Sequence, residues 1–229
     1  MRYFLAMWCS AFLFCSSAGA VEPASVTSTA ALVNGAVITT AEYRTELSRV
    51  LRMRTKSVAG MEPTALALLK KETLETLIGR ELLYQESQRK GIRVAAAAVE
   101  GEIGKLRKKF KTEKEFKASL EKIGMSEETV TTQISRGMAI QSLIDAEFGA
   151  TTVVSEADAK SYYISNPDAF LQPGKDREGR AEAALSFEAV RDRIIKQLHR
   201  ERTEREVMLY LKRLRAESRV EIHLEESGE

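Results

Sequence analysis

The sequence predicts a mostly α-helical protein with one small β-sheet built from residues near the two ends of the chain. Among its 229 residues there are only 4 Pro and 13 Gly, while the strong helix formers Leu, Ala, Glu, Lys and Arg are abundant. Capping motifs and glycines divide the chain into amphipathic segments. A composition of 44% hydrophobic and 30% charged residues is typical of a folded globular chain.

Residues 1–20 have the pattern of an export signal. Arg2 precedes an uncharged, mostly apolar stretch that ends in a small-x-small sequence, and we expect cleavage after Ala20. The apolar stretch is too short to span a bilayer. Both cysteines, Cys9 and Cys15, lie in this segment, and neither follows the small residues that lipid attachment requires. The sequence therefore predicts an exported protein, located in the periplasm or outside the cell, whose mature chain has no thiol chemistry.

A β-hairpin is expected at the start of the folded part, after a polar tether over residues 21–30. Two apolar runs, residues 31–33 and 36–38, flank an Asn-Gly pair at 34–35, which favours a type I′ turn. Two strands alone are marginal in water, so a third is needed. Residues 219–224 alternate apolar and polar side chains with period two and supply that strand.

Capping motifs mark the beginnings of the helices between these strands. Thr39 with Glu42 and Ser155 with Asp158 have capping-box spacing, and Ser126 precedes two glutamates. Glycines or an Asn-Pro pair end most segments. We expect helices over about residues 40–56, 62–90, 95–110, 112–123, 126–148 and 155–166, and a long helix over 186–217.

The long helix near the C-terminus has an interrupted apolar face. Apolar residues over 187–198 share one face, which becomes polar at Glu201 and Arg205. Met208 and Leu211 then restore its apolar character. Such a helix is expected to cross between two packed regions or to line an open groove.

No motif for catalysis, a cofactor or a metal occurs in the sequence. His199 and His223 lack partners at metal-ligand spacing. The serines lack the Gly-x-Ser-x-Gly pattern, and no phosphate-binding or dinucleotide-binding glycine motif is present. The 35 basic residues nearly balance the 33 acidic ones, which disfavours nucleic acid as a partner. We therefore expect no cofactor and no catalytic residue.

Two basic segments are interpreted as solvated helix faces. Residues 105–111 form the densest run and could meet phosphates, an acidic polypeptide or anionic lipid headgroups. Glutamates at 113, 115 and 121 follow directly, which favours an ordinary solvated face. Acidic residues likewise interleave the arginine-rich segment 191–215.

Four local sequences occur in the chain in a characteristic order. They are residues 33–39 (VNGAVIT), 77–86 (LIGRELLYQE), 91–94 (GIRV) and the segment 162–170 with its Tyr-Tyr, Asn-Pro and final Phe. Together they resemble the N-terminal module of the SurA-like periplasmic chaperones and their relatives among the parvulin-type peptidyl-prolyl isomerases. The resemblance covers most of residues 31–170 and implies a helical domain there.

The chain departs from that family after Phe170. The isomerases carry a parvulin domain of about a hundred residues at this point, whereas here residues 171–185 form only a short, polar loop before the last helix. A domain cannot form from so few residues. The resemblance therefore does not imply prolyl isomerase activity for this chain. Residues 186–229 resemble the family's returning helix and strand, which implies that they pack back onto the N-terminal helices.

The resemblance implies a chaperone that holds unfolded or partly folded envelope proteins, including outer-membrane proteins. It implies no catalysed reaction and no stable insertion of this protein into a membrane. Client side chains would be buried in an apolar crevice between helices. The alternative is a dedicated interaction subunit of an export or polysaccharide-secretion machine, which would have one partner and no general client affinity. Candidate contacts, chosen on short or boundary segments, are Met53, Met61, Phe110, Phe116 and Met125.

Overall fold

The structure, a computed structural model, describes residues 28–54, 61–122, 124–171 and 185–224. The predicted signal (1–20), most of the tether and most of the loop 171–185 lie outside these residues. The elements in chain order are β1 (Thr29–Val33), β2 (Ala36–Thr39), α1 (Thr40–Arg54), α2 (Pro63–Arg89), α3 (Ala96–Arg107), α4 (Glu113–Lys122), α5 (Glu127–Phe148), α6 (Glu156–Ser165), the 3-10 helix η2 (Pro167–Phe170), α7 (Phe187–Ala216) and β3 (Val220–Ile222). The predicted fold class, mostly helical with one small sheet, is confirmed.

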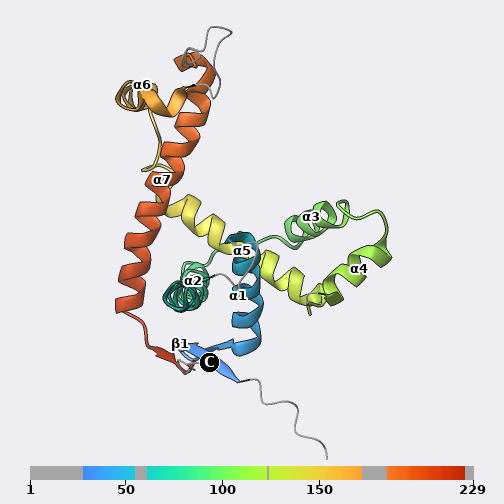
Figure 1. The fold of residues 1–229 in the computed structure, drawn as a ribbon. Coiled ribbons are helices and arrows are strands. Elements are labelled where there is room, and N and C mark those ends of the chain that lie inside the picture. Colours follow the sequence, from blue (N-terminus) through green and yellow to red (C-terminus); the bar gives the residue numbers. More distant parts are fainter. Residues whose placement is uncertain (1–27, 55–60, 123, 172–184, 225–229) are drawn as a thin grey trace, which may run out of the picture.

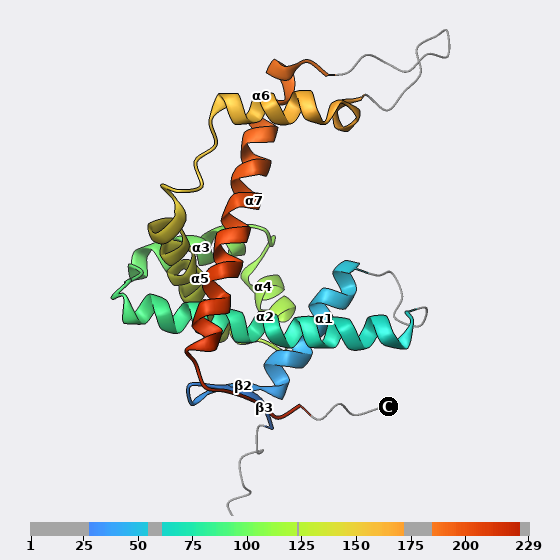
Figure 2. The same ribbon diagram turned by 90° about the vertical axis from the view of Figure 1, so that its left-hand side faces the viewer.

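The three strands form one antiparallel sheet in the order β2-β1-β3, which lies below α7 in Figure 2. Leu32 is paired with Val37, and Ala31 with Ile222. The turn between β1 and β2 has positive φ angles at both Asn34 (51°) and Gly35 (87°), as the predicted type I′ turn requires. Strand β1 begins at Thr29, two residues earlier than the sequence pattern indicates.

Replacing Gly35 by Ala is expected to lower the free energy of unfolding by about 1–2 kcal/mol, because a Cβ is disfavoured at positive φ. Gly101 of α3 provides the control, since a Cβ there meets nothing within 4 Å. Gly101→Ala should raise stability by about 0.5–1 kcal/mol, because glycine weakens a helix interior. Urea unfolding followed by circular dichroism measures both, and equal effects would contradict the turn assignment.

The predicted helix caps are confirmed. The backbone N–H of Thr39 donates to the Glu42 carboxylate at 2.8 Å, and the N–H of Glu42 donates to the Thr39 hydroxyl at 3.1 Å. Ser155 and Asp158 form the same reciprocal pair at the start of α6. The Ser126 hydroxyl accepts from the N–H of Thr129 at 3.0 Å. Local chemistry therefore fixes where these helices begin.

Helix α2 lies at the centre of the fold and contacts the sheet, α1, α5 and α7. Its residues Leu74, Ile78 and Leu82 pack against the buried side of the sheet. Its Leu83 joins Leu143 of α5 and residues of α7 in a second cluster. Two parts extend away from this body in Figure 1: α3, α4 and the start of α5 on one side, and α6 with the first half of α7 at the top.

Helix α7 joins two packed regions, as its interrupted face predicts. Near its start Val190 and Ile194 pack against α6 and η2, and near its end Tyr210 with Leu211 and Leu214 packs against α2 and α5. At 3.6 residues per turn these two sets point in directions roughly half a turn apart. The helix thus uses nearly opposite faces for the two regions.

This change of face leaves Met208 outside both packed regions. Met208 restores the apolar character of the first face in the sequence, but its side chain is 68% exposed. Glu201, Arg205 and Met208 continue the direction of Ile194, which at this level of the helix points away from α2 and α5. Leu211 packs as predicted.

Candidate binding surfaces

The extension built from α3, α4 and the start of α5 has its own small apolar core, which we call the arm cluster. Phe116, Leu120 and Val130 are its buried members, and the partly buried residues packed on them are Leu106, Phe110, Met125 and Ile134. The rings of Phe110 and Phe116 lie 5.4 Å apart at a tilt of 57°. The extension is therefore a packed unit rather than a set of separate helices.

Three of the five predicted contact residues come together in the arm cluster. Phe110 and Met125 lie on segments between helices and are partly exposed. Phe116, in contrast, is 0% exposed. The reason for choosing it, a boundary position with accessible surface, does not hold, because the first half of α4 turns its ring inward against α5.

The other two predicted contacts lie apart from the arm cluster. Met53 is in the last turn of α1 and is 73% exposed, and its sulfur lies 3.1 Å from a guanidinium nitrogen of Arg49. Met61 precedes α2 and is partly buried. Neither belongs to an apolar cluster within the described parts of the chain.

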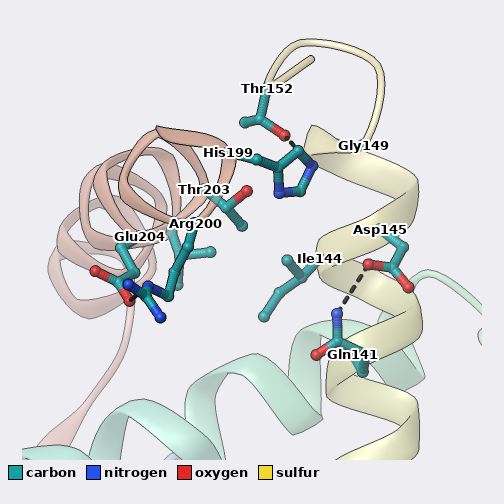
Figure 3. A pocket seen from close by; sticks show the side chains of 10 residues that line it. Gln141, Ile144, Asp145, Gly149, Thr152, His199, Arg200, Thr203 and Glu204 are labelled. Atoms are coloured by element: carbon teal, nitrogen blue, oxygen red, sulfur yellow. Dashed lines mark hydrogen bonds and ion pairs between the residues drawn. The ribbon is translucent and has the colours of Figure 1, made fainter. Parts of the chain in front are cut away.

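A pocket of about 360 Å³ lies between the C-terminal half of α5 and the middle of α7 (Figure 3). Ile144 and Val207 give it apolar walls, and His199 and Thr203 are among its polar ones. The hydroxyl of the buried Thr152 donates to the carbonyl of Phe148 at 2.9 Å and lies 3.3 Å from Nε2 of His199. The middle of α7 thus lines an open pocket, one of the two roles expected from its sequence.

The side chain of Thr203 leaves one polar group of this pocket unused. Its hydroxyl oxygen is buried and has no hydrogen-bond partner among the described residues. A mixed lining of this kind can receive an apolar side chain together with polar groups of a bound chain. We call this site the α5–α7 pocket.

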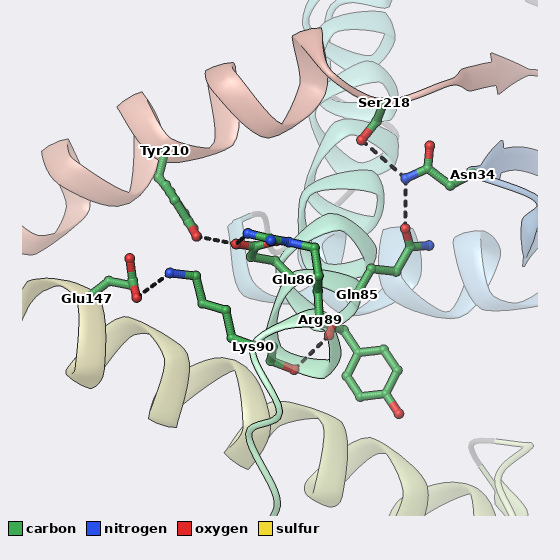
Figure 4. Close-up of polar contacts among 10 residues, drawn as sticks. Asn34, Gln85, Glu86, Arg89, Lys90, Glu147, Tyr210 and Ser218 are labelled. Carbon is green, nitrogen blue, oxygen red and sulfur yellow. Dashed lines mark hydrogen bonds and ion pairs between the residues drawn. The ribbon is translucent and has the colours of Figure 1, made fainter.

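Residues 77–86 are part of α2, and their polar side chains form hydrogen bonds that hold the hairpin on this helix (Figure 4). The amide nitrogen of Gln85 donates to the carbonyl of Val33 at 2.9 Å and to the Glu81 carboxylate at 2.8 Å. The amide of Asn34 donates to Gln85 at 2.8 Å, and its oxygen accepts from the N–H of Arg219 at 2.9 Å. The turn, α2 and the C-terminal strand are thereby joined.

Glu81 also connects α2 to α5. It forms an ion pair with Arg136, whose guanidinium lies 4.1 Å from the centre of the Tyr84 ring. The segment that resembles the family therefore has a structural role: its charged residues hold neighbouring helices in place.

Glu86 connects α2 to α7. Its carboxylate accepts a hydrogen bond of 2.7 Å from the Tyr210 hydroxyl and two of 2.6 Å from Arg89. These bonds, those from Arg89 first, lower the pKa of Glu86 from 4.5 to about 2. Burial, and then the bond to Glu86, raises the pKa of Tyr210 from 10.0 to about 12. The returning helix is thus held by a buried charged hydrogen bond.

Several exposed apolar side chains were not selected from the sequence. They include Leu68 on α2, Ile164 on α6, and Met208 and Leu209 on α7, each between 58% and 68% exposed. The residues three and four positions from Leu68, Ile164 and Leu209 are mostly polar. Helical periodicity therefore places these three side chains outside the apolar stripes.

The sheet that joins both ends of the described chain and the central α2 define a mostly helical module with partly exposed apolar surfaces. No group of three or more His, Cys, Asp or Glu suited to a metal ion occurs within the described residues. Among the same residues, no helix is long and apolar enough to cross a membrane. The family described as the SurA-like N-terminal domain matches residues 1–144, so the chain belongs to it.

Curated relatives support this assignment. The chain is 26% identical over 155 residues to a protein named Chaperone SurA from Pseudomonas fluorescens (strain Pf-5), which covers 67% of this chain and 36% of that protein. It is 29% identical over 130 residues to Chaperone SurA from Chromobacterium violaceum, which covers 56% of this chain and 30% of that protein. The matched part thus spans about a third of the relatives' length.

The fold has a counterpart among solved structures. A chain from the work on PEB4 and Cj1289, two structurally related SurA-like chaperones of Campylobacter jejuni, superimposes with a TM-score of 0.50. The match covers 86% of this chain and 100% of that chain at 14% sequence identity. It shows a shared fold that includes most of the residues beyond 144.

Proposed function

We propose that this protein is a periplasmic chaperone that holds unfolded envelope polypeptides and does not isomerise prolines. Membership of the SurA-like family supports the chaperone role. The apparent export signal supports the location, with cleavage after Ala20. The short segment between η2 and α7, which spans residues 171–186, supports the lack of isomerase activity, because it is too short for a domain.

The observation that carries the proposal is the α5–α7 pocket. The pocket has apolar walls from Ile144 and Val207 and polar groups beside them. A site of mixed chemistry accepts segments of varied sequence, since it requires neither a specific charge nor a specific shape. This fits a client class defined by unfolding rather than by sequence.

Met53, Met61, Phe110 and Met125 are the proposed additional contacts. All four are partly or largely exposed, and the flexible thioethers of methionine adapt to different partners. Within the arm cluster, Phe116 packs beneath Phe110. Because a disordered client loses conformational entropy on binding, affinity is limited and release is fast.

The test follows aggregation of a urea-diluted outer-membrane β-barrel protein by light scattering, with the chain purified from the periplasmic fraction. Suppression should rise with the ratio of this protein to client, and a globular protein of similar charge should have no effect. N-terminal sequencing of the same sample tests cleavage before Val21. No suppression by a folded, helical sample would overturn the holdase proposal in favour of a dedicated partner.

Two variants test the contact residues. Met53→Ser combined with Met61→Ser should raise the amount needed for half-maximal suppression at least twofold, because accessible apolar surface is lost. Met208→Ser combined with Leu209→Ser is the control, since these side chains are 68% and 59% exposed and lie outside the proposed contacts. Equal effects of both would contradict the assignment. A proline-isomerisation assay on a short peptide should show no acceleration, and measurable catalysis would overturn that part.

A further inference from the structure

The turn between α3 and α4 carries a dense group of lysines that the proposed function does not use. We propose that this tip, residues 105–117, binds the anionic headgroups of a phospholipid bilayer. The contact is peripheral and electrostatic, and it does not depend on client binding.

The charge of the tip is strongly unbalanced. Residues 105–117 contain seven Lys or Arg and two Glu. Four exposed lysines have no ion pair with any described residue, and these are Lys108, Lys109, Lys111 and Lys114. The whole chain, by comparison, has a formal net charge of only +2. The positive charge is therefore local to this end of the arm.

Both acidic residues of the tip already have partners. Glu113 lies 3.8 Å from Arg107 and 4.0 Å from Lys117. The carboxylate of Glu115 accepts from the backbone N–H of Lys111 at 3.0 Å and forms no ion pair with the Lys111 ammonium. The sequence alone suggested that these glutamates neutralise the run. In the structure Glu113 pairs with Arg107 and Lys117, and Glu115 binds a backbone N–H, so neither forms an ion pair with the four lysines.

The tip is held at the end of a packed extension. In Figure 1 the turn between α3 and α4 lies at the end of the arm, far from α7. Hydrogen bonds from the N–H of Lys109 to the carbonyl of Leu106 (3.1 Å) and from Phe110 to Arg107 (3.0 Å) shape the turn. The Phe110 ring anchors it on Phe116. The lysines thus extend from a fixed base.

A lipid surface fits these features better than an acidic polypeptide. The four unpaired cations are all lysines, which act as flexible point charges, whereas arginines present the planar donors that favour specific carboxylate pairs. They surround a projecting turn, and the α5–α7 pocket includes no residue of the tip. A flat anionic surface can contact all four at once, and each basic residue near such a surface strengthens binding about fivefold.

The test is flotation of the whole protein with vesicles of phosphatidylcholine containing about one third phosphatidylglycerol, compared with phosphatidylcholine alone. The protein should float only with the anionic vesicles, and raising the salt from about 0.05 M to about 0.5 M should release it. The tip variant changes Lys108, Lys109, Lys111 and Lys114 to Gln and should bind at least tenfold more weakly.

The control variant changes Lys71, Lys160, Lys196 and Lys212 to Gln. These lysines are also exposed and without ion pairs among the described residues, but they lie on α2, α6 and α7. It has the same net charge as the tip variant, so it should keep vesicle binding within about twofold if position matters. A second tip variant with Arg at all four positions should bind as the native protein does.

Three outcomes would overturn the proposal: equal loss in the two Gln variants, no flotation of the native protein, or binding of the tip to polyglutamate but not to vesicles. The last would indicate an acidic polypeptide as the partner. Suppression of client aggregation by the tip variant should be unchanged, and this separates failure of the lipid proposal from failure of the proposed chaperone function.

Discussion

Phe116→Ala is expected to lower the free energy of unfolding of the arm by about 3–5 kcal/mol, the usual cost of removing a buried aromatic ring. The ring is 0% exposed and contacts Phe110 and Leu120 on one extension of the fold. The arm cluster is small, so no neighbouring core compensates for the cavity. Urea unfolding by circular dichroism measures the loss, and amide hydrogen exchange should locate it in α3, α4 and the start of α5.

Phe110→Ala is the matched control, because it removes the same ring from a partly exposed position of the same cluster. It should cost about 1–2 kcal/mol, but it should weaken suppression of client aggregation, since Phe110 is a proposed contact. If Phe116→Ala does not fold, Phe116→Leu keeps much of the volume and should show a smaller loss. A cost below about 1 kcal/mol for Phe116→Ala would contradict the packing described here.

The elements of this fold could be predicted from the sequence because their signals are local. The caps at Thr39, Ser126 and Ser155 each involve residues within three positions. The Asn-Gly turn needs two positive φ values that few other residues adopt. The C-terminal strand could be paired with the hairpin because two strands cannot persist without a third.

The faces that pair could not be predicted in the same way. Nothing within α7 indicates that Ile194 and Tyr210 pack in nearly opposite directions, since that depends on where α6, α2 and α5 lie. The exposure of Met208 and the burial of Phe116 follow from such tertiary arrangements. Candidate contacts chosen from segment boundaries alone therefore include one core residue.

The hydrogen bonds and ion pairs that join α2 to other elements also could not be predicted from the sequence. Glu86 and Tyr210 are 124 positions apart, and the sequence of one chain holds no signal that joins them. The resemblance of residues 77–86 to a family identified the segment but not its role. The structure assigns that role: Glu81, Gln85 and Glu86 each bind a different neighbouring element.

Stability should fall as the pH drops from about 4.5 towards 2, in part because of Glu86. Its pKa is about 2 in the folded chain and near 4.5 when unfolded, so below pH 4.5 the unfolded state binds the proton first. The stabilisation is fully present above that range. We expect it to amount to about 1–2 kcal/mol, because Arg89, the largest cause of the shift, is exposed and its charge is screened.

Glu86→Gln should reduce the fall in the free energy of unfolding between about pH 4.5 and 2. Tyr210→Phe should reduce a second fall in that free energy between about pH 10 and 12, where only the unfolded tyrosine ionises. Glu46 and Asp158 also have lowered pKa values, so the difference between variant and native chain isolates the part of Glu86.

The double variant separates the Glu86–Tyr210 bond from the rest of the network. Removal of either partner leaves a buried polar group, so each single change should cost about 1–3 kcal/mol and the two should cost less together than their sum. Glu102→Gln, which removes an exposed pair with Lys105, should cost about 0.5 kcal/mol or less at any pH. Strict additivity of Glu86→Gln and Tyr210→Phe would show that this bond does not hold the returning helix on α2. The returning helix would then be held on α2 by apolar packing of residues such as Leu211 and by the ion pair of Arg215 with Glu75.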